Sequence, residues 1–172
     1  MPQTVRSLRR RLESSAGALK ALTSGIEPAE AIWKPDAGRW SILEVINHLA
    51  DEEVEDFRTR LDILLHRPED PFPPIDPQRW VVARAYARRG PEESLARFLA
   101  ERARTLDWLE QIEATNLDRE KPRPGGGSIT ARELMAAWAA HALLHVRQIT
   151  RLRYDSLADE VAPSSLAYAG RW

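Results

Sequence analysis

The distribution of glycine and proline constrains this chain more than any other feature. Of its 172 residues only 8 are glycine, and long stretches contain neither glycine nor proline. These two residues are the least compatible with the interior of a helix, so the uninterrupted stretches predict a fold dominated by helices. Hydrophobic residues make up 43% and charged residues 30% of the chain, a balance typical of a globular protein rather than a disordered one.

One long helix is predicted to begin at Ser41. Ser41 and Glu44 form the S-x-x-E capping box, in which hydroxyl and carboxylate satisfy free backbone N–H groups of the first turn. Apolar residues then recur at three- and four-residue steps as far as Leu64, and Pro68 ends the pattern. Residues 68–77 contain five prolines and predict an extended crossover rather than regular structure.

Three more long helices are predicted from the same combination of apolar periodicity and end signals. They are expected to cover approximately residues 3–23, 91–112 and 130–153. The last of them begins with a second capping box, formed by Thr130 and Glu133. A short helix is expected at about 78–88, and the stretch 121–127, with its prolines and glycines, is expected to be a loop.

Together these elements predict an all-α fold, a four-helix bundle with a long crossover between its second and third helices. The pattern contains no competing pair of strands. We expect a single domain over residues 1–172, with the bundle core at about 3–153. The tail at 154–172 is weakly patterned and has room for one short helix.

Charge and composition exclude several classes of function. The 25 basic and 26 acidic residues leave a net charge of -1, which favours neither nucleic acid nor a membrane as partner. Acids interleave with many of the arginines between 84 and 104, which predicts a solvated face. No cysteine is present, so disulfides, thiolate ligands and cysteine nucleophiles are excluded. Neither a signal peptide nor an apolar run of about 18 residues occurs, so we expect a cytoplasmic protein.

Two of the four histidines stand in the sequence H-A-L-L-H, as His141 and His145. Residues four apart on a helix lie about 40° apart around its axis, so both rings project from one face and can chelate one metal ion. The alternative is a helix face with two exposed or internally hydrogen-bonded histidines. No charged residue lies between Glu133 and Arg147, which indicates a buried face, and buried imidazoles need partners that a metal would supply.

His48 lies in the helix predicted from Ser41, one turn after Glu44 and one turn before Glu52. Taken alone, it is better explained as a boundary histidine paired with one of these two acids. A bundle brings one helix beside another, however, and three histidines with an open fourth position form a recurrent catalytic site. This pattern favours His48 as the third ligand. His66, at a helix end, is assigned no chemistry.

Several motifs together resemble those of one known family. W-S-I-L-E-V-I-N-H-L-A-D-E-E at 40–53 and H-A-L-L-H-V-R-Q-I at 141–149 are similar to motifs of the DinB/YfiT-like superfamily. The resemblance runs from about Trp33 to Arg153 and includes P-F-P-P-I-D-P in the crossover and S-I-T-A-R-E-L at the start of the last helix.

The resemblance implies a four-helix bundle with a long crossover between helices two and three. It also implies a divalent metal, nickel or zinc among others, held by His48, His141 and His145. Members of the family often form homodimers. Some of them are transferases or isomerases that use low-molecular-weight thiols of bacteria.

We therefore expect a metal-dependent enzyme, a thiol S-transferase or a hydrolase, that acts on a small molecule at a three-histidine site with an open position. Glu52 is the candidate catalytic carboxylate, although its position also fits a solvated surface glutamate. Trp40, Trp138 and Gln148 are candidate substrate-lining residues, with packing as the alternative. Two other functions stay open: a non-catalytic metal-binding or stress-response dimer, and a helical interaction module whose histidines lie in the core.

Overall fold

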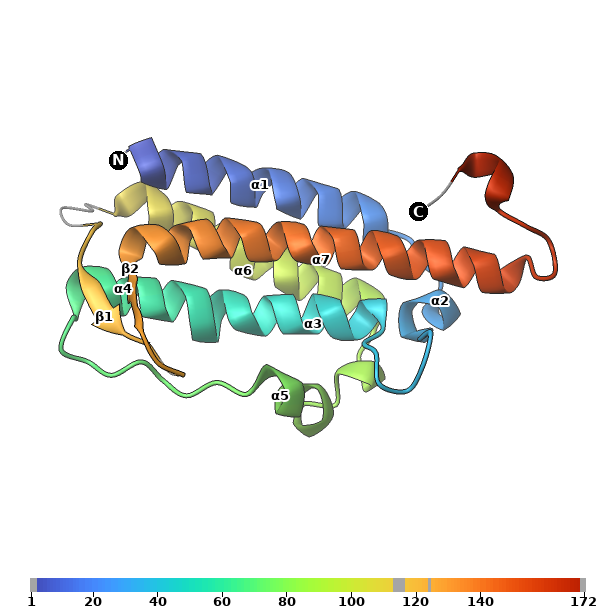
Figure 1. Cartoon of the computed structure of the whole chain (residues 1–172), viewed down its shortest axis with the longest axis horizontal. Helices are drawn as coiled ribbons and strands as arrows, with labels where there is room; N and C mark the ends of the chain where they lie inside the picture. Colours follow the sequence, from blue (N-terminus) through green and yellow to red (C-terminus); the bar gives the residue numbers. More distant parts are fainter. Residues whose placement is uncertain (1–2, 113–116, 124, 171–172) are drawn as a thin grey trace.

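The computed structural model describes residues 3–112, 117–123 and 125–170 of the chain. Its four long helical segments lie side by side (Figure 1). They are α1 (Gln3–Thr23), the continuous run of α3 (Ile42–Glu52), η1 (Glu53–Arg58) and α4 (Thr59–His66), α6 (Pro91–Gln111) and α7 (Ala131–Glu160). Helix α1 and helix α3 each pack against both α6 and α7. This arrangement confirms the predicted all-α four-helix bundle.

Both predicted capping boxes form and fix the starts of the helices that carry the histidines. The Ser41 hydroxyl accepts a hydrogen bond from the Glu44 backbone N–H, and the Glu44 carboxylate accepts one from the Ser41 N–H, at the start of α3. Thr130 and Glu133 make the same reciprocal pair at the start of α7. Local sequence therefore sets where these two helices begin.

The long crossover runs beside α3 (Figure 1). It contains α5 (Pro77–Ala83), which is capped by the Asp76 carboxylate and contacts α3, and η2 (Tyr86–Arg88). The single short helix expected at 78–88 is thus two pieces. Ala85 separates them because its backbone is left-handed, with a φ of 49°, which no helix continues.

The segment before α7 differs from the prediction. Strands β1 (Glu120–Pro122) and β2 (Ser128–Thr130) form an antiparallel hairpin, so the expectation of no strand pair is wrong. The turn between them uses Gly125, Gly126 and Gly127, which all have positive φ. Each strand is only three residues long, too short for an alternating apolar pattern to predict it.

Two helical boundaries also differ from the prediction. Helix α7 continues to Glu160 rather than ending near Arg153, because no proline or glycine interrupts it before Pro163. The five-residue helix α2 (Pro28–Ile32) was not predicted. The tail contains the short helix η3 (Ala167–Ala169). None of the helices in the described part of the chain is long and apolar enough to cross a membrane.

The core consists of two apolar halves separated by a layer of buried polar residues. One half includes Leu8, Leu12, Phe57, Leu61, Leu109 and Trp138. The other includes Leu19, Val45, Leu49, Phe98, Ile149 and Leu152. Buried polar side chains occupy the intervening positions of the helices, namely Ser15, Glu52, Glu53, Arg102, Thr105 and His145. We call these six residues the polar layer, and it includes one of the predicted metal ligands.

Candidate metal centre

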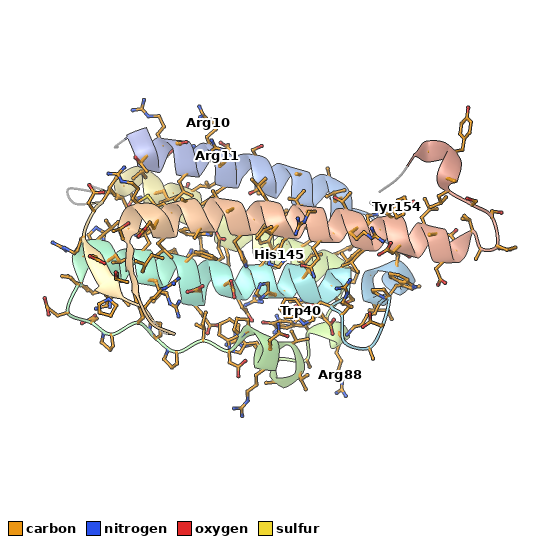
Figure 2. The ribbon with its side chains drawn as sticks, viewed as in Figure 1. Arg10, Arg11, Trp40, Arg88, His145 and Tyr154 are labelled. Carbon is orange, nitrogen blue, oxygen red and sulfur yellow. The ribbon has the colours of Figure 1, made fainter. Side chains whose placement is uncertain are left out.

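The three predicted ligands come together between two helices. His48 projects from α3, and His141 and His145 project from α7, so that one ring nitrogen of each lies within 4.8 Å of the others. Figure 2 shows His145 between α7 and α3. The four-residue spacing on α7 places the Nε2 atoms of His141 and His145 3.0 Å apart. The ring centroid of His48 lies 4.9 Å from that of His145 and 5.5 Å from that of His141.

This cluster fits a divalent ion. Two imidazole nitrogens bound about 2.1 Å from one tetrahedral ion lie roughly 3.4 Å apart, so small side-chain movements would bring all three nitrogens onto one ion. His48 and His145 are buried, and among the described residues the buried Nδ1 of His48 has no hydrogen-bond partner. Leaving such an atom unpaired costs free energy that a bound ligand offsets. Nitrogen donors of this kind suit zinc and nickel.

Burial keeps the imidazoles neutral. Burial and, to a smaller extent, the neighbouring His145 together lower the pKa of His48 and of His141 to about 3, because burial disfavours a charged ring and two adjacent imidazolium charges repel. The pKa of His145 is also lowered by burial, against an opposing hydrogen bond to Gln148. At neutral pH the ring nitrogens therefore carry the lone pairs that a metal requires.

Gln148 fixes which nitrogen of His145 is free. Its amide oxygen Oε1 lies 2.8 Å from His145 Nδ1. An amide oxygen only accepts hydrogen bonds, so Nδ1 carries the ring proton and Nε2, which faces His141, keeps its lone pair. A partner of this kind orients a metal-binding histidine and sets its tautomer.

Glu52 lies against the histidines rather than on a solvated surface. Its side chain is buried, with Oε2 3.2 Å from His141 Nε2 and Oε1 3.8 Å from His48 Nδ1. Burial raises the pKa of Glu52 to about 8, Asp56 adds to the rise, and Arg60 opposes it. The interpretation of Glu52 as a surface residue is therefore wrong. Its carboxylate is within reach of any group bound at the histidine nitrogens.

The two candidate tryptophans have different environments. The ring of Trp40 lies 4.7 Å from that of His48, and Trp40 lines a pocket of about 570 Å³ together with Gln148. Trp138 is 1% exposed, stacks on Phe57 and donates from Nε1 to Glu53. Its placement favours packing in the core rather than contact with a substrate.

A buried ion pair beside the site was not predicted from the sequence. Arg102 and Glu53, each with a side chain 2% exposed, form two hydrogen bonds of 2.6 and 2.8 Å. Arg102 also donates to the carbonyl of Leu12 on α1. The expectation that the arginines of this region lie on a solvated face is wrong for Arg102, because its partner lies 49 residues away and gives no local signal.

A second unpredicted network holds the crossover against α3. The buried carboxylate of Asp51 accepts hydrogen bonds from the Tyr86 hydroxyl, from Arg97 and, at 2.6 Å, from Arg84. Burial alone would raise the pKa of Asp51, but these three donors outweigh it and lower that pKa below its usual value. Asp51 thereby connects α3 to α6 and to the segment after α5.

Comparisons with known proteins identify the family of this chain. Residues 11–149 match the family model of the DinB superfamily. The chain is also 29% identical over 117 residues to an Oceanobacillus iheyensis protein named "putative metal-dependent hydrolase". That match covers 67% of this chain and 66% of the relative, just under two thirds of its length.

A solved structure supports the fold. The chain superposes on YfiT from Bacillus subtilis, described as "a probable metal-dependent hydrolase with an unusual four-helix bundle topology", with a TM-score of 0.78. The superposition covers 91% of this chain and 90% of YfiT at 20% sequence identity. At that identity the likeness establishes the fold alone.

Proposed function

The chain belongs to the DinB superfamily, and from this premise we propose that it is a metal-dependent hydrolase of a small molecule. In this proposal His48, His141 and His145 hold one divalent ion, nickel or zinc, and leave a coordination position open. The observation that carries the proposal is the cluster of three neutral ring nitrogens within 4.8 Å. The name of the O. iheyensis relative supports hydrolysis as the reaction class.

The chemistry expected at the site follows from its charges. A divalent ion held by three neutral imidazoles keeps its full charge and lowers the pKa of water or of a thiol that occupies the open position. The charge of the ion would also counter the raised pKa of Glu52 and favour its carboxylate, which lies 3.2 Å from His141 Nε2 and is placed to accept the proton that the nucleophile loses. Gln148 keeps His145 in the tautomer that binds metal.

Transfer to or from a low-molecular-weight thiol is the second candidate. The same charge on the ion would stabilise a thiolate, and the chain has no cysteine of its own, so the thiol would be a separate substrate. The two candidates share the histidines and Glu52 and differ only in the nucleophile.

The first experiment measures metal in the purified protein by mass spectrometry. We expect about one nickel or zinc ion per chain, and loss of that ion in His141→Ala. His66→Ala is the matched control, because His66 is exposed and pairs with Asp62 instead. Unchanged metal content in His141→Ala would refute the site.

The second experiment assays the metal-loaded protein against esters, amides and phosphoesters, and separately against thiols mixed with electrophiles. Turnover of the first group supports hydrolysis, and turnover only of the second supports the transferase. A metal-loaded protein inactive in both would instead support a binding function.

A further inference from the structure

A pocket of about 570 Å³ lies beside the histidine cluster, between the segment that precedes α3 and the second half of α7. Two residues of its lining also contact the candidate ligands. The Trp40 ring lies 4.7 Å from the His48 ring, and Gln148 is hydrogen-bonded to His145. The pocket therefore adjoins the candidate ligands at Trp40 and Gln148.

The pocket carries an excess of positive charge. Arg39, Arg147, Arg151 and Asp155 are its charged lining residues. Arg151 pairs with Asp155 at 2.8 Å, which leaves the other two arginines. Within the described ranges neither Arg39 nor Arg147 has an ion-pair partner, so the lining has two uncompensated positive charges.

Arg39 and Arg147 differ in their pairing from the other arginines near the candidate site. Arg84, Arg97 and Arg102 are each paired with a carboxylate of α3 or η1. Arg39 and Arg147 are exposed, and their guanidinium groups are available. Guanidinium groups bind carboxylates and phosphates with charge-assisted, often bidentate hydrogen bonds.

Apart from Gln148, the rest of the lining is apolar. Pro35, Trp40, Leu144 and Leu152 line the pocket along with the arginines. Such a lining buries a hydrocarbon or aromatic body while the charged groups orient the ligand. An ion with no apolar part would leave these apolar side chains without a ligand surface to pack against.

We propose, building on the proposed function, that the substrate is an organic anion. Its carboxylate or phosphate binds Arg39 and Arg147, and its apolar body lies against Trp40 and Leu144. Trp40 and Gln148 then direct the other end of the molecule towards the histidines. This assigns the two arginines as binding residues that select the substrate by charge.

The test titrates four probes of similar size into metal-loaded and metal-free protein and follows them by ligand-observed NMR. Phenylacetate and phenyl phosphate carry the anion, while phenylacetamide is neutral and 2-phenylethylammonium is cationic. We expect the anions to bind with dissociation constants on the order of millimolar, as suits ligands of this size. The neutral and cationic probes should bind at least tenfold more weakly. The tighter of the two anions identifies carboxylate or phosphate as the preferred group.

Variants connect the binding to the named residues. The double variant Arg39→Gln, Arg147→Gln should weaken binding of the anions at least tenfold in both forms of the protein. The double variant Arg6→Gln, Arg10→Gln is the matched control, since it also removes two positive charges, from exposed positions on α1. Metal content, measured in parallel, should be unchanged in the double variant, so failure of the pocket and failure of the metal centre are distinguishable.

Three results would overturn the proposal. Equal binding of phenylacetamide and phenylacetate would show that charge does not select the ligand. Full binding of phenylacetate by the double variant would show that the arginines do not hold it. Loss of binding on metal removal alone would show that the anion binds the ion rather than the pocket.

Discussion

Glu52 is the acidic residue of α3 whose carboxylate faces the histidine cluster. It lies within 3.8 Å of ring nitrogens from both His48 and His141. Replacing it by glutamine keeps the shape but removes the proton acceptor. We expect Glu52→Gln to lower kcat about 10²- to 10⁴-fold on whichever substrate turns over, while metal content stays the same.

The control for this variant is Glu69→Gln, which makes the same change at an exposed position of the crossover. Its kcat should equal that of the wild type. If Glu52→Gln retained full activity with its metal in place, the carboxylate would not be the proton acceptor.

Gln148 gives a prediction that does not require a substrate. Because its amide oxygen fixes the His145 tautomer, Gln148→Ala should weaken zinc binding about 10- to 100-fold, measured by competition with a chromogenic chelator. Gln78→Ala, exposed on α5, should bind zinc like the wild type. An unchanged affinity in Gln148→Ala would mean that the hydrogen bond does not set the tautomer.

The sequence predicted the residues whose roles depend on local spacing. His141 and His145 share a face because they are four apart, and Ser41 caps its helix because Glu44 is three residues later. The burial of Glu53 could not be predicted in this way. Its partner Arg102 is distant in the chain, and only the packing of α6 against η1 brings the two together.

Among the elements, η1 explains why a run of acids lies inside the protein. This segment is a π-helix, and the Thr59 hydroxyl donates to the carbonyl of Val54 five residues before it. Glu52, Glu53 and Asp56 are all buried at or within it. Sequence patterns assume 3.6 residues per turn, so they assign such a run to a surface. A π-helical turn of this kind is frequent at functional sites.

The crossover gives a prediction on stability at this scale. Asp51 has a pKa lowered by Tyr86, Arg97 and Arg84 against its burial, so its charge stabilises the fold above the unfolded-state pKa of 3.8. That contribution is lost as the pH falls through the lower pKa of the folded state. We expect Asp51→Asn to reduce the free energy of unfolding by about 3 kcal/mol at pH 7.

Urea denaturation at pH 7 and at about pH 2.5 measures this effect, and the difference between wild type and Asp51→Asn should shrink at the lower pH. Asp70→Asn, which removes an exposed partner of Arg67, should cost less than about 1 kcal/mol. A loss in Asp51→Asn that is the same at both pH values would show that the ionised carboxylate is not what stabilises the crossover.

For the whole molecule, the candidate ligands lie far apart in the sequence, on α3 and α7. A metal that binds them binds only the folded chain. At a free concentration about 100 times its dissociation constant, it should add about 2.7 kcal/mol. For a chain of 172 residues this corresponds to a rise in Tm of about 5–10 °C.

Differential scanning calorimetry with and without chelator measures the rise. His66→Ala should show the full rise, because His66 lies outside the cluster. His141→Ala should show none. The same rise in His141→Ala would place the stabilising ion somewhere other than the histidine cluster.

The division of the core into two apolar halves has a consequence for how this fold changes over time. Each half draws residues from several helices, so each can hold those helices in register on its own side of the polar layer. The layer itself has two parts, because His145 and Glu52 belong to the candidate site while Arg102 and Glu53 join α6 to η1. Substitutions of His145 or Glu52 should therefore change the candidate site while the two apolar halves keep the helices packed, whereas substitutions of Arg102 or Glu53 break a buried ion pair between helices.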